Sequence, residues 1–152
     1  MSSKVSVLNR QARVRVDRQK IGAAARRILK TLGYGGYELA VVLVDDREIT
    51  RLNRQYFRRN RPTNVISFPM MEETLLFPRG RVLGDVVISS ETAERQAAEV
   101  GKKTEDEVLF LLIHGILHLV GYDHEKAREK RVEMEAKEQE LFALLKDSSL
   151  RG

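Results

Sequence analysis

The three histidines of this chain all fall within one short segment, HGILHLVGYDH, at positions 114–124. His114 and His118 are four residues apart, so on a helix their rings project from one face, one turn apart. Gly121 can then take the left-handed conformation that ends a helix, and the turn can bring His124 back against the other two rings. Three neutral imidazoles with an open fourth position describe a catalytic zinc site.

The spacing of these residues is that of the long zinc motif HExxHxxGxxH of metzincin peptidases. In those enzymes a glutamate directly after the first histidine is the general base, whereas this chain has Gly115 there. A lone histidine on an apolar helix is usually a hydrogen-bonded core residue, but three gathered at this spacing favour metal binding. We therefore predict a metal site whose substrate is not a peptide. Imidazole also suits nickel, copper and iron.

The elements that must position these residues follow from hydrophobic periodicity and capping signals. Thr104, with Glu107 three residues later, forms a capping box that opens the helix carrying the first two histidines. Other predicted caps are Asp17, Asp45 or Asp46, and Ser90. The predicted order is strands at 5–7 and 13–16, helix 18–32, strand 37–46, helix 48–56, strands at 64–68 and 83–89, and helices at 91–100, from 104, and 126–146.

This order predicts an α/β (α+β) fold in which residues 1–152 form one domain, with a small mixed central sheet of about four strands packed by about five helices. The 42% hydrophobic and 32% charged residues indicate a folded globular protein. The longest apolar stretch, Val108–Val120, is too short to span a bilayer, and the first residues lack the apolar core of a secretory signal. The lack of cysteine fits a reducing cytoplasm, so we expect a cytoplasmic location, and the short apolar stretch leads us to expect no membrane partner.

The charge of the chain is divided unevenly along its length. Residues 1–90 carry 17 basic and 8 acidic side chains, whereas residues 91–147 carry 9 basic and 14 acidic ones. A basic surface attracts phosphate backbones, although such charge can also be only a solvated face. The segment RLNRQYFRRNR at 51–61 concentrates arginines that could contact RNA: Arg51, Arg54, Arg58, Arg59 and Arg61.

Other side chains near these motifs are weaker candidates. Tyr56, Phe57 and Phe68 could stack on RNA bases, with core packing the alternative for Phe68. Asp123 either orients a histidine or caps the final helix. Asp85 is expected to pair with an arginine or a histidine N–H, because an unpaired carboxylate within a buried strand is costly. Asn64 and Ser67 are candidate polar groups near the cleft.

Three segments of the sequence together resemble one known family. HGILHLVGYDH resembles the signature of the YbeY family of bacterial metal-dependent endoribonucleases. LNRQYFRRNRPTNVISFP at 52–69 looks like that family's LNxxYRxxxxPT(D/N)V(L/I)SFP segment, and LGDVVIS at 83–89 matches its LGD-containing strand. The order and spacing of the segments also agree, from about residue 38 to the last helix.

The resemblance implies an α/β domain with a mixed sheet and a zinc ion bound by His114, His118 and His124. It also implies cleavage of single-stranded RNA, processing of ribosomal RNA that includes maturation of the 16S rRNA 3′ end, and ribosome quality control. The sequence departs from the family at one position. The family has an arginine after the aromatic residue of LNxxY, whereas Tyr56 is followed here by Phe57, so we assign the catalytic role to Arg58.

We therefore predict a zinc-dependent endoribonuclease, with Arg58 and Asp123 as catalytic residues. The alternatives are a metal hydrolase of another substrate, such as a peptide, and a ribosome-binding module in which zinc only stiffens the fold. The sequence leaves open whether the nucleophile is a zinc-bound hydroxide or the RNA 2′-hydroxyl.

Overall fold

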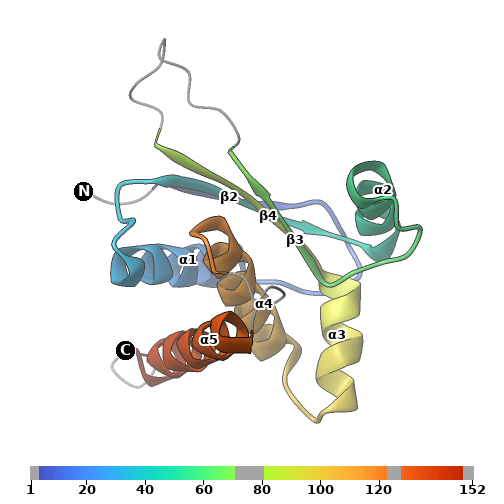
Figure 1. Ribbon diagram of the computed structural model, residues 1–152. Helices are drawn as coiled ribbons and strands as arrows, with labels where there is room; N and C mark the ends of the chain where they lie inside the picture. Colours follow the sequence, from blue (N-terminus) through green and yellow to red (C-terminus); the bar gives the residue numbers. More distant parts are fainter. Residues whose placement is uncertain (1–3, 71–80, 123–127, 149–152) are drawn as a thin grey trace.

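A four-stranded sheet forms the centre of the computed structural model, which describes residues 4–70, 81–122 and 128–148 (Figure 1). Its strands, in the spatial order β1-β2-β4-β3, are β1 (Lys4–Asn9), β2 (Glu38–Val44), β4 (Val82–Ser89) and β3 (Val65–Pro69). The β1, β2 and β4 strands run parallel, whereas β3 pairs antiparallel with β4 at the edge. The predicted small mixed sheet is confirmed.

Five helices pack around this sheet in the described part of the chain, as predicted: α1 (Arg18–Leu32), α2 (Asp46–Phe57), α3 (Ser90–Glu99), α4 (Thr104–Leu119) and α5 (Arg128–Ser148). In Figure 1, α1, α4 and α5 lie on one side of the sheet and α2 lies across from them. Alternate residues of β2 follow this division: Leu39, Val41 and Leu43 join the large core under α1, α4 and α5, while Val44 joins a smaller cluster with Ile49 of α2.

Local capping signals predicted some helix starts correctly and others not. Asp17 caps α1 by accepting a hydrogen bond from the Lys20 backbone N–H, and Asp45 caps α2. The other two predicted caps are wrong, because each helix begins one residue earlier. Ser89, not Ser90, caps α3, and Thr104 already lies in α4, whose preceding residue Lys103 makes no side-chain cap bond.

The strand predicted at residues 13–16 is wrong, because a side chain satisfies the backbone there instead of a neighbouring strand. Gln11 Oε1 accepts hydrogen bonds from the N–H groups of Arg13 and Val14, and Gln11 Nε2 donates to the Val14 carbonyl. The segment is therefore a loop between β1 and α1.

No helix within the described ranges combines the length and the apolar character needed to cross a membrane.

One partly buried polar network joins the starts of α2 and α3. Asp46 accepts hydrogen bonds from Ser89 Oγ at 2.6 Å, Thr92 Oγ1 at 2.6 Å and Arg95 Nη1 at 2.7 Å. Although partial burial alone would raise the pKa of Asp46, the hydrogen bonds from Ser89, Thr92 and Arg95 and the charge of Arg95 hold that pKa below its usual value. The ionised carboxylate therefore stabilises the fold.

We expect Asp46→Asn to lower the free energy of unfolding at pH 7 by about 1 kcal/mol, because the amide cannot replace a charged acceptor. A carboxyl whose pKa is lower in the folded state adds stability above its unfolded pKa of about 3.9, and this is lost as pH falls through the folded value. The gap between wild type and variant should therefore close below about pH 4 in urea titrations followed by circular dichroism. Asp85→Asn, an exposed control, should change stability by less than about 0.5 kcal/mol. A gap that stays constant down to pH 2 would contradict this role.

Candidate metal centre

Two of the predicted ligands lie together on α4. His114 Nε2 and His118 Nε2 are 3.2 Å apart, and the ring centroids are 4.7 Å apart. Two nitrogens bound to one tetrahedral zinc at about 2.0–2.1 Å would be separated by about 3.3 Å. The pair therefore fits a shared metal ion, and its imidazole donors suit zinc. Both rings are half-buried, whereas the three residues between them, 115–117, are buried.

The end of α4 has the glycine turn that the sequence predicted. Gly121 has φ 105°, and its N–H donates to the His118 carbonyl at 3.1 Å. The Tyr122 N–H donates to the Leu117 carbonyl at 2.9 Å, which completes a Schellman motif. Partly buried Tyr122 also packs against the main core, so the chain leaves the helix in a fixed direction. Asp123 and His124 follow directly but lie outside the described residues, so their predicted roles stay predictions.

At Gly115 the backbone of α4 packs closely against the sheet. A Cβ added there would lie 2.6 Å from Val86 Cγ1 and 3.2 Å from Val65 Cγ2. Ser67 Oγ of β3 donates to the Gly115 carbonyl at 2.7 Å, which joins strand and helix beside His114. A side chain at position 115 would point into the sheet rather than toward the histidines. The general-base glutamate of the peptidase motif therefore has no place here.

A cleft of about 490 Å³ opens beside the two histidines. We call it the histidine cleft; it is lined by Asn53, Phe57, Arg59, Thr63, Asn64, Val65, Ile66, Ser67, Pro69, His114 and His118. These residues come from α4, from strand β3, and from the end of α2 with the loop that follows it. The arginine-rich segment and the histidine motif, more than fifty residues apart in the sequence, therefore share one cleft.

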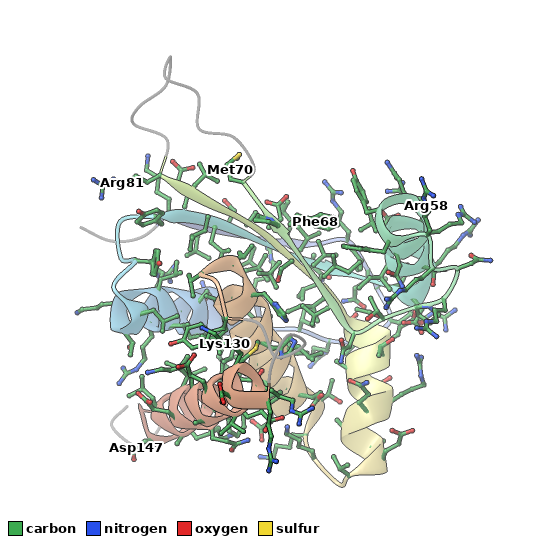
Figure 2. The ribbon with its side chains drawn as sticks, viewed as in Figure 1. Arg58, Phe68, Met70, Arg81, Lys130 and Asp147 are labelled. Atoms are coloured by element: carbon green, nitrogen blue, oxygen red, sulfur yellow. The ribbon has the colours of Figure 1, made fainter. Side chains whose placement is uncertain are left out.

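Arg58 and Arg59, which follow the position where the family has an arginine, lie differently in the structure. Arg59 lines the histidine cleft, whereas Arg58 does not. Arg58 is the residue after α2, with a left-handed backbone at φ 58° and an exposed side chain. Figure 2 shows the nitrogen-bearing side chains crowded around α2, where Arg58 is labelled. The catalytic role of Arg58 stays a prediction, but the cleft favours Arg59.

The other predicted RNA-binding arginines lie on neighbouring surface. Arg51 and Arg54 line a second, larger groove of about 930 Å³ along α2. Arg51 also forms an ion pair with Glu48, with 2.6 Å between Nη2 and Oε2, and its Nη1 donates a hydrogen bond to Gln55 Oε1. The side chain of Arg61 is exposed, while its carbonyl accepts a hydrogen bond from Asn53 Nδ2 at 2.9 Å. This bond fixes the loop after α2.

Three aromatic rings contact one another at the end of α2, and two of them, Tyr56 and Phe68, line a groove on the outer face of the sheet. The Tyr56 and Phe68 ring centroids are 5.0 Å apart, and those of Phe57 and Phe68 are 6.4 Å apart. Tyr56 and Phe57 are 56% and 50% exposed, while Phe68 is partly buried and packs under α2. Exposure leaves the first two rings accessible for stacking, and Phe68 supports them from below. Only Phe57 of the three lines the histidine cleft itself.

Two of the remaining polar candidates lie in the cleft and one does not. Asn64 and Ser67 line it, and Asn64 Nδ2 donates to Gln96 Oε1 at 3.2 Å. Asp85 was predicted to be buried and paired, and this is wrong. It lies opposite Ala40 on the outer face of the sheet, where its side chain is exposed and lines a different groove. Since water solvates its carboxylate, no buried partner is required.

Sequence reasoning missed one residue that contacts the site, Glu138 of α5. The residue is only 5% exposed, and its Oε2 contacts His114 Nδ1. A signal was present in the sequence, because Met134, Glu138, Leu141 and Leu145 follow the helical spacing of one apolar face. A carboxylate within such a face needs a buried partner. Its partner was not predictable from the helix alone.

Comparison with known proteins agrees with this geometry. The family model described as Endoribonuclease YbeY matches residues 6–146. Proteins named Endoribonuclease YbeY from Geobacter metallireducens and Aquifex aeolicus are 47% and 46% identical; the matches cover 97% and 92% of this chain and 99% and 90% of theirs. The solution structure of TM1509 from Thermotoga maritima is similar with a TM-score of 0.68 and 29% identity, over 97% of this chain and 92% of that one.

The fold, the histidine pair and these matches define an RNA-cleaving enzyme rather than a peptidase. The chain belongs to the YbeY family of endoribonucleases, as its three sequence segments predicted.

The close approach at Gly115 can be tested by substitution. Gly115→Ala should lower the free energy of unfolding by about 1–2 kcal/mol, because the overlap with Val86 outweighs the better helix propensity of alanine. The matched control is Gly22→Ala in α1, where the added Cβ would lie 3.5 Å or more from its neighbours. It should stabilise the protein by up to about 1 kcal/mol. Urea unfolding checks both, and equal stabilisation by the two changes would contradict the close packing of α4.

Proposed function

We propose that this endoribonuclease depends on zinc and cleaves single-stranded RNA during ribosomal RNA processing. The observation that carries the proposal is the pair of Nε2 atoms, 3.2 Å apart, at a cleft that also contains Arg59. We further propose that the processing includes maturation of the 16S rRNA 3′ end and quality control of ribosomes. The ribosome is then the partner and the cytoplasm the location.

The proposed ligands are His114 and His118, with His124 as the predicted third. Zinc, when bound with an open position, would lower the pKa of a water molecule or polarise a phosphoryl oxygen. The chain's own residues supply the surroundings. Partial burial of both histidines and the fixed end of α4 hold the donor atoms toward the cleft. This arrangement supports a catalytic rather than a closed structural site.

The arginines and aromatic residues beside the histidines are proposed to bind the RNA strand. Arg59 can donate two hydrogen bonds to phosphate oxygens and stabilise charge that develops on them. Phe57, half exposed on the same cleft, can stack on an unpaired base, which a paired and stacked duplex does not offer. Arg51 and Arg54 extend the positive surface along α2. Together they support a preference for single-stranded RNA.

The two alternative functions make different predictions about the same residues. A peptidase of the HExxH design needs a carboxylate at position 115, where the backbone of Gly115 packs against Val86. A ribosome-binding module with structural zinc would need the metal in order to fold. The extensive apolar core between the sheet and α4 supports a protein that folds without metal, which disfavours the module with structural zinc.

We expect His114→Ala to remain folded but to lose zinc binding and to lower cleavage of single-stranded RNA at least about a thousandfold. Metal content of protein purified without a histidine tag, circular dichroism, and digestion of a labelled oligonucleotide measure the three properties. Wild-type protein stripped of zinc by a chelator should keep its helical signal and regain cleavage when zinc is restored. Cleavage by the metal-free variant would refute the zinc-dependent enzyme, and unfolding of stripped wild type would support the structural-zinc alternative.

Replacing Arg59 and its neighbour Arg58 in turn tests which of them contacts the phosphate. Arg59→Ala should lower kcat/KM by about a hundredfold, the cost of removing one preorganised donor to developing charge. Arg58→Ala should lower it less than about tenfold, as expected for loss of a positive charge near the backbone. Steady-state cleavage of the same oligonucleotide measures both. A larger effect at Arg58 would instead assign the catalytic role that the sequence predicted to Arg58.

A further inference from the structure

A buried carboxylate from the final helix, which does not line the histidine cleft, contacts the histidine site. Glu138 lies between Met134 and Leu141 on the face of α5 that packs into the core, and those two side chains are fully buried. Glu138 itself is 5% exposed, and its Oε2 contacts Nδ1 of His114. The contact joins two helices across 24 residues of sequence.

A glutamate at this position is not explained by packing. Burying an ionised carboxylate is costly unless it is paired and hydrogen-bonded, and a leucine or methionine would fill the same space without that cost. Glu133, Glu135 and Glu140 of the same helix are exposed, as glutamates usually are. The buried position of Glu138 is therefore best explained by the histidine that it contacts.

The contact has a direct consequence for the imidazole of His114. A carboxylate at Nδ1 accepts a hydrogen bond from that nitrogen, which places the ring proton on Nδ1 and leaves the lone pair on Nε2. His114 Nε2 is the atom that lies 3.2 Å from His118 Nε2. The carboxylate also restricts rotation of the ring and makes Nε2 a stronger donor.

We infer that Glu138 is a positioning residue that fixes the tautomer and orientation of His114 for metal binding. This inference rests on the proposed zinc dependence and deepens it. It gives α5 a role beyond covering the core, because the last helix holds a ligand of the metal site in α4. It also explains how the histidine stays ready to bind metal when no metal is present.

The test begins with metal-free wild-type protein, in which long-range proton–nitrogen NMR reports the tautomer of each histidine ring. The inference predicts the Nδ1–H form for His114, and the Nε2–H form would overturn it. This measurement needs neither a variant nor activity.

The second arm compares Glu138→Gln with Glu140→Gln, an exposed control on the same helix whose carboxylate pairs with Lys137 at the surface. Competition with a chromophoric chelator should show zinc affinity 10–100-fold weaker in Glu138→Gln and unchanged in the control. The urea midpoint of the metal-free Glu138→Gln protein, which keeps the shape of the side chain, should stay close to that of wild type. A merely structural glutamate would give the reverse, a lowered midpoint with unchanged zinc affinity.

The wild-type arm separates the two possible failures. If wild type binds zinc and cleaves RNA while Glu138→Gln binds zinc equally tightly, the role of Glu138 is refuted and the proposed function stands. If wild type binds no zinc, the proposed zinc dependence fails and the inference about Glu138 fails with it.

Discussion

The close packing of α4 against the sheet is the constraint on which the site depends. All residues of this helix from 111 to 117 are buried except His114, which is partly buried. The helix packs against β3, β4, α1, α3 and α5. His118 emerges one turn later on the same side. Gly115 permits this contact, since any side chain would hold the helix away from Val86. The direction in which the imidazoles point is therefore set by core packing.

The uneven charge of the sequence is carried by particular elements. Residues 46–61, which form α2 and the start of the following loop, hold six arginines and two acidic side chains, whereas α5 is nearly neutral, with five basic and six acidic side chains. A basic segment of this kind attracts phosphate, and its residue Arg59 lines the histidine cleft. Glu138 of α5 contacts His114 but is buried and does not line the cleft, so it adds no carboxylate to the surface of the cleft.

Local signals in the sequence predicted what depends on nearby residues. The periodic apolar face of α1 and its Asp17 cap gave its bounds correctly, and Gly121 ends α4 as predicted. Some errors were local, namely the one-residue displacement of the starts of α3 and α4 and the loop at 13–16 that Gln11 holds. The errors that matter for the site concern partners that are distant in sequence. Asp85 was taken as buried because its neighbours in β4 are apolar, but only one face of the sheet is covered at that point. Glu138 was missed because its partner is on another helix.

The histidine motif shows why spacing predicts a metal but not the reaction. Positions 114, 118 and 121 match a peptidase motif because any helix that presents two imidazoles and then turns needs four-residue spacing and a glycine. What differs is the surface against which the helix packs. In this fold the residue after the first histidine contacts the sheet, so a general base at that position has no access to a substrate. The other wall of the cleft is formed by strand β3 and the loop after α2, which contribute Ser67, Asn64 and Arg59. Ser67 and Asn64 already donate hydrogen bonds to Gly115 and Gln96, so the guanidinium of Arg59 is the group of the three best suited to phosphate oxygens. A guanidinium on the same cleft as the two imidazoles suits a phosphodiester better than a peptide.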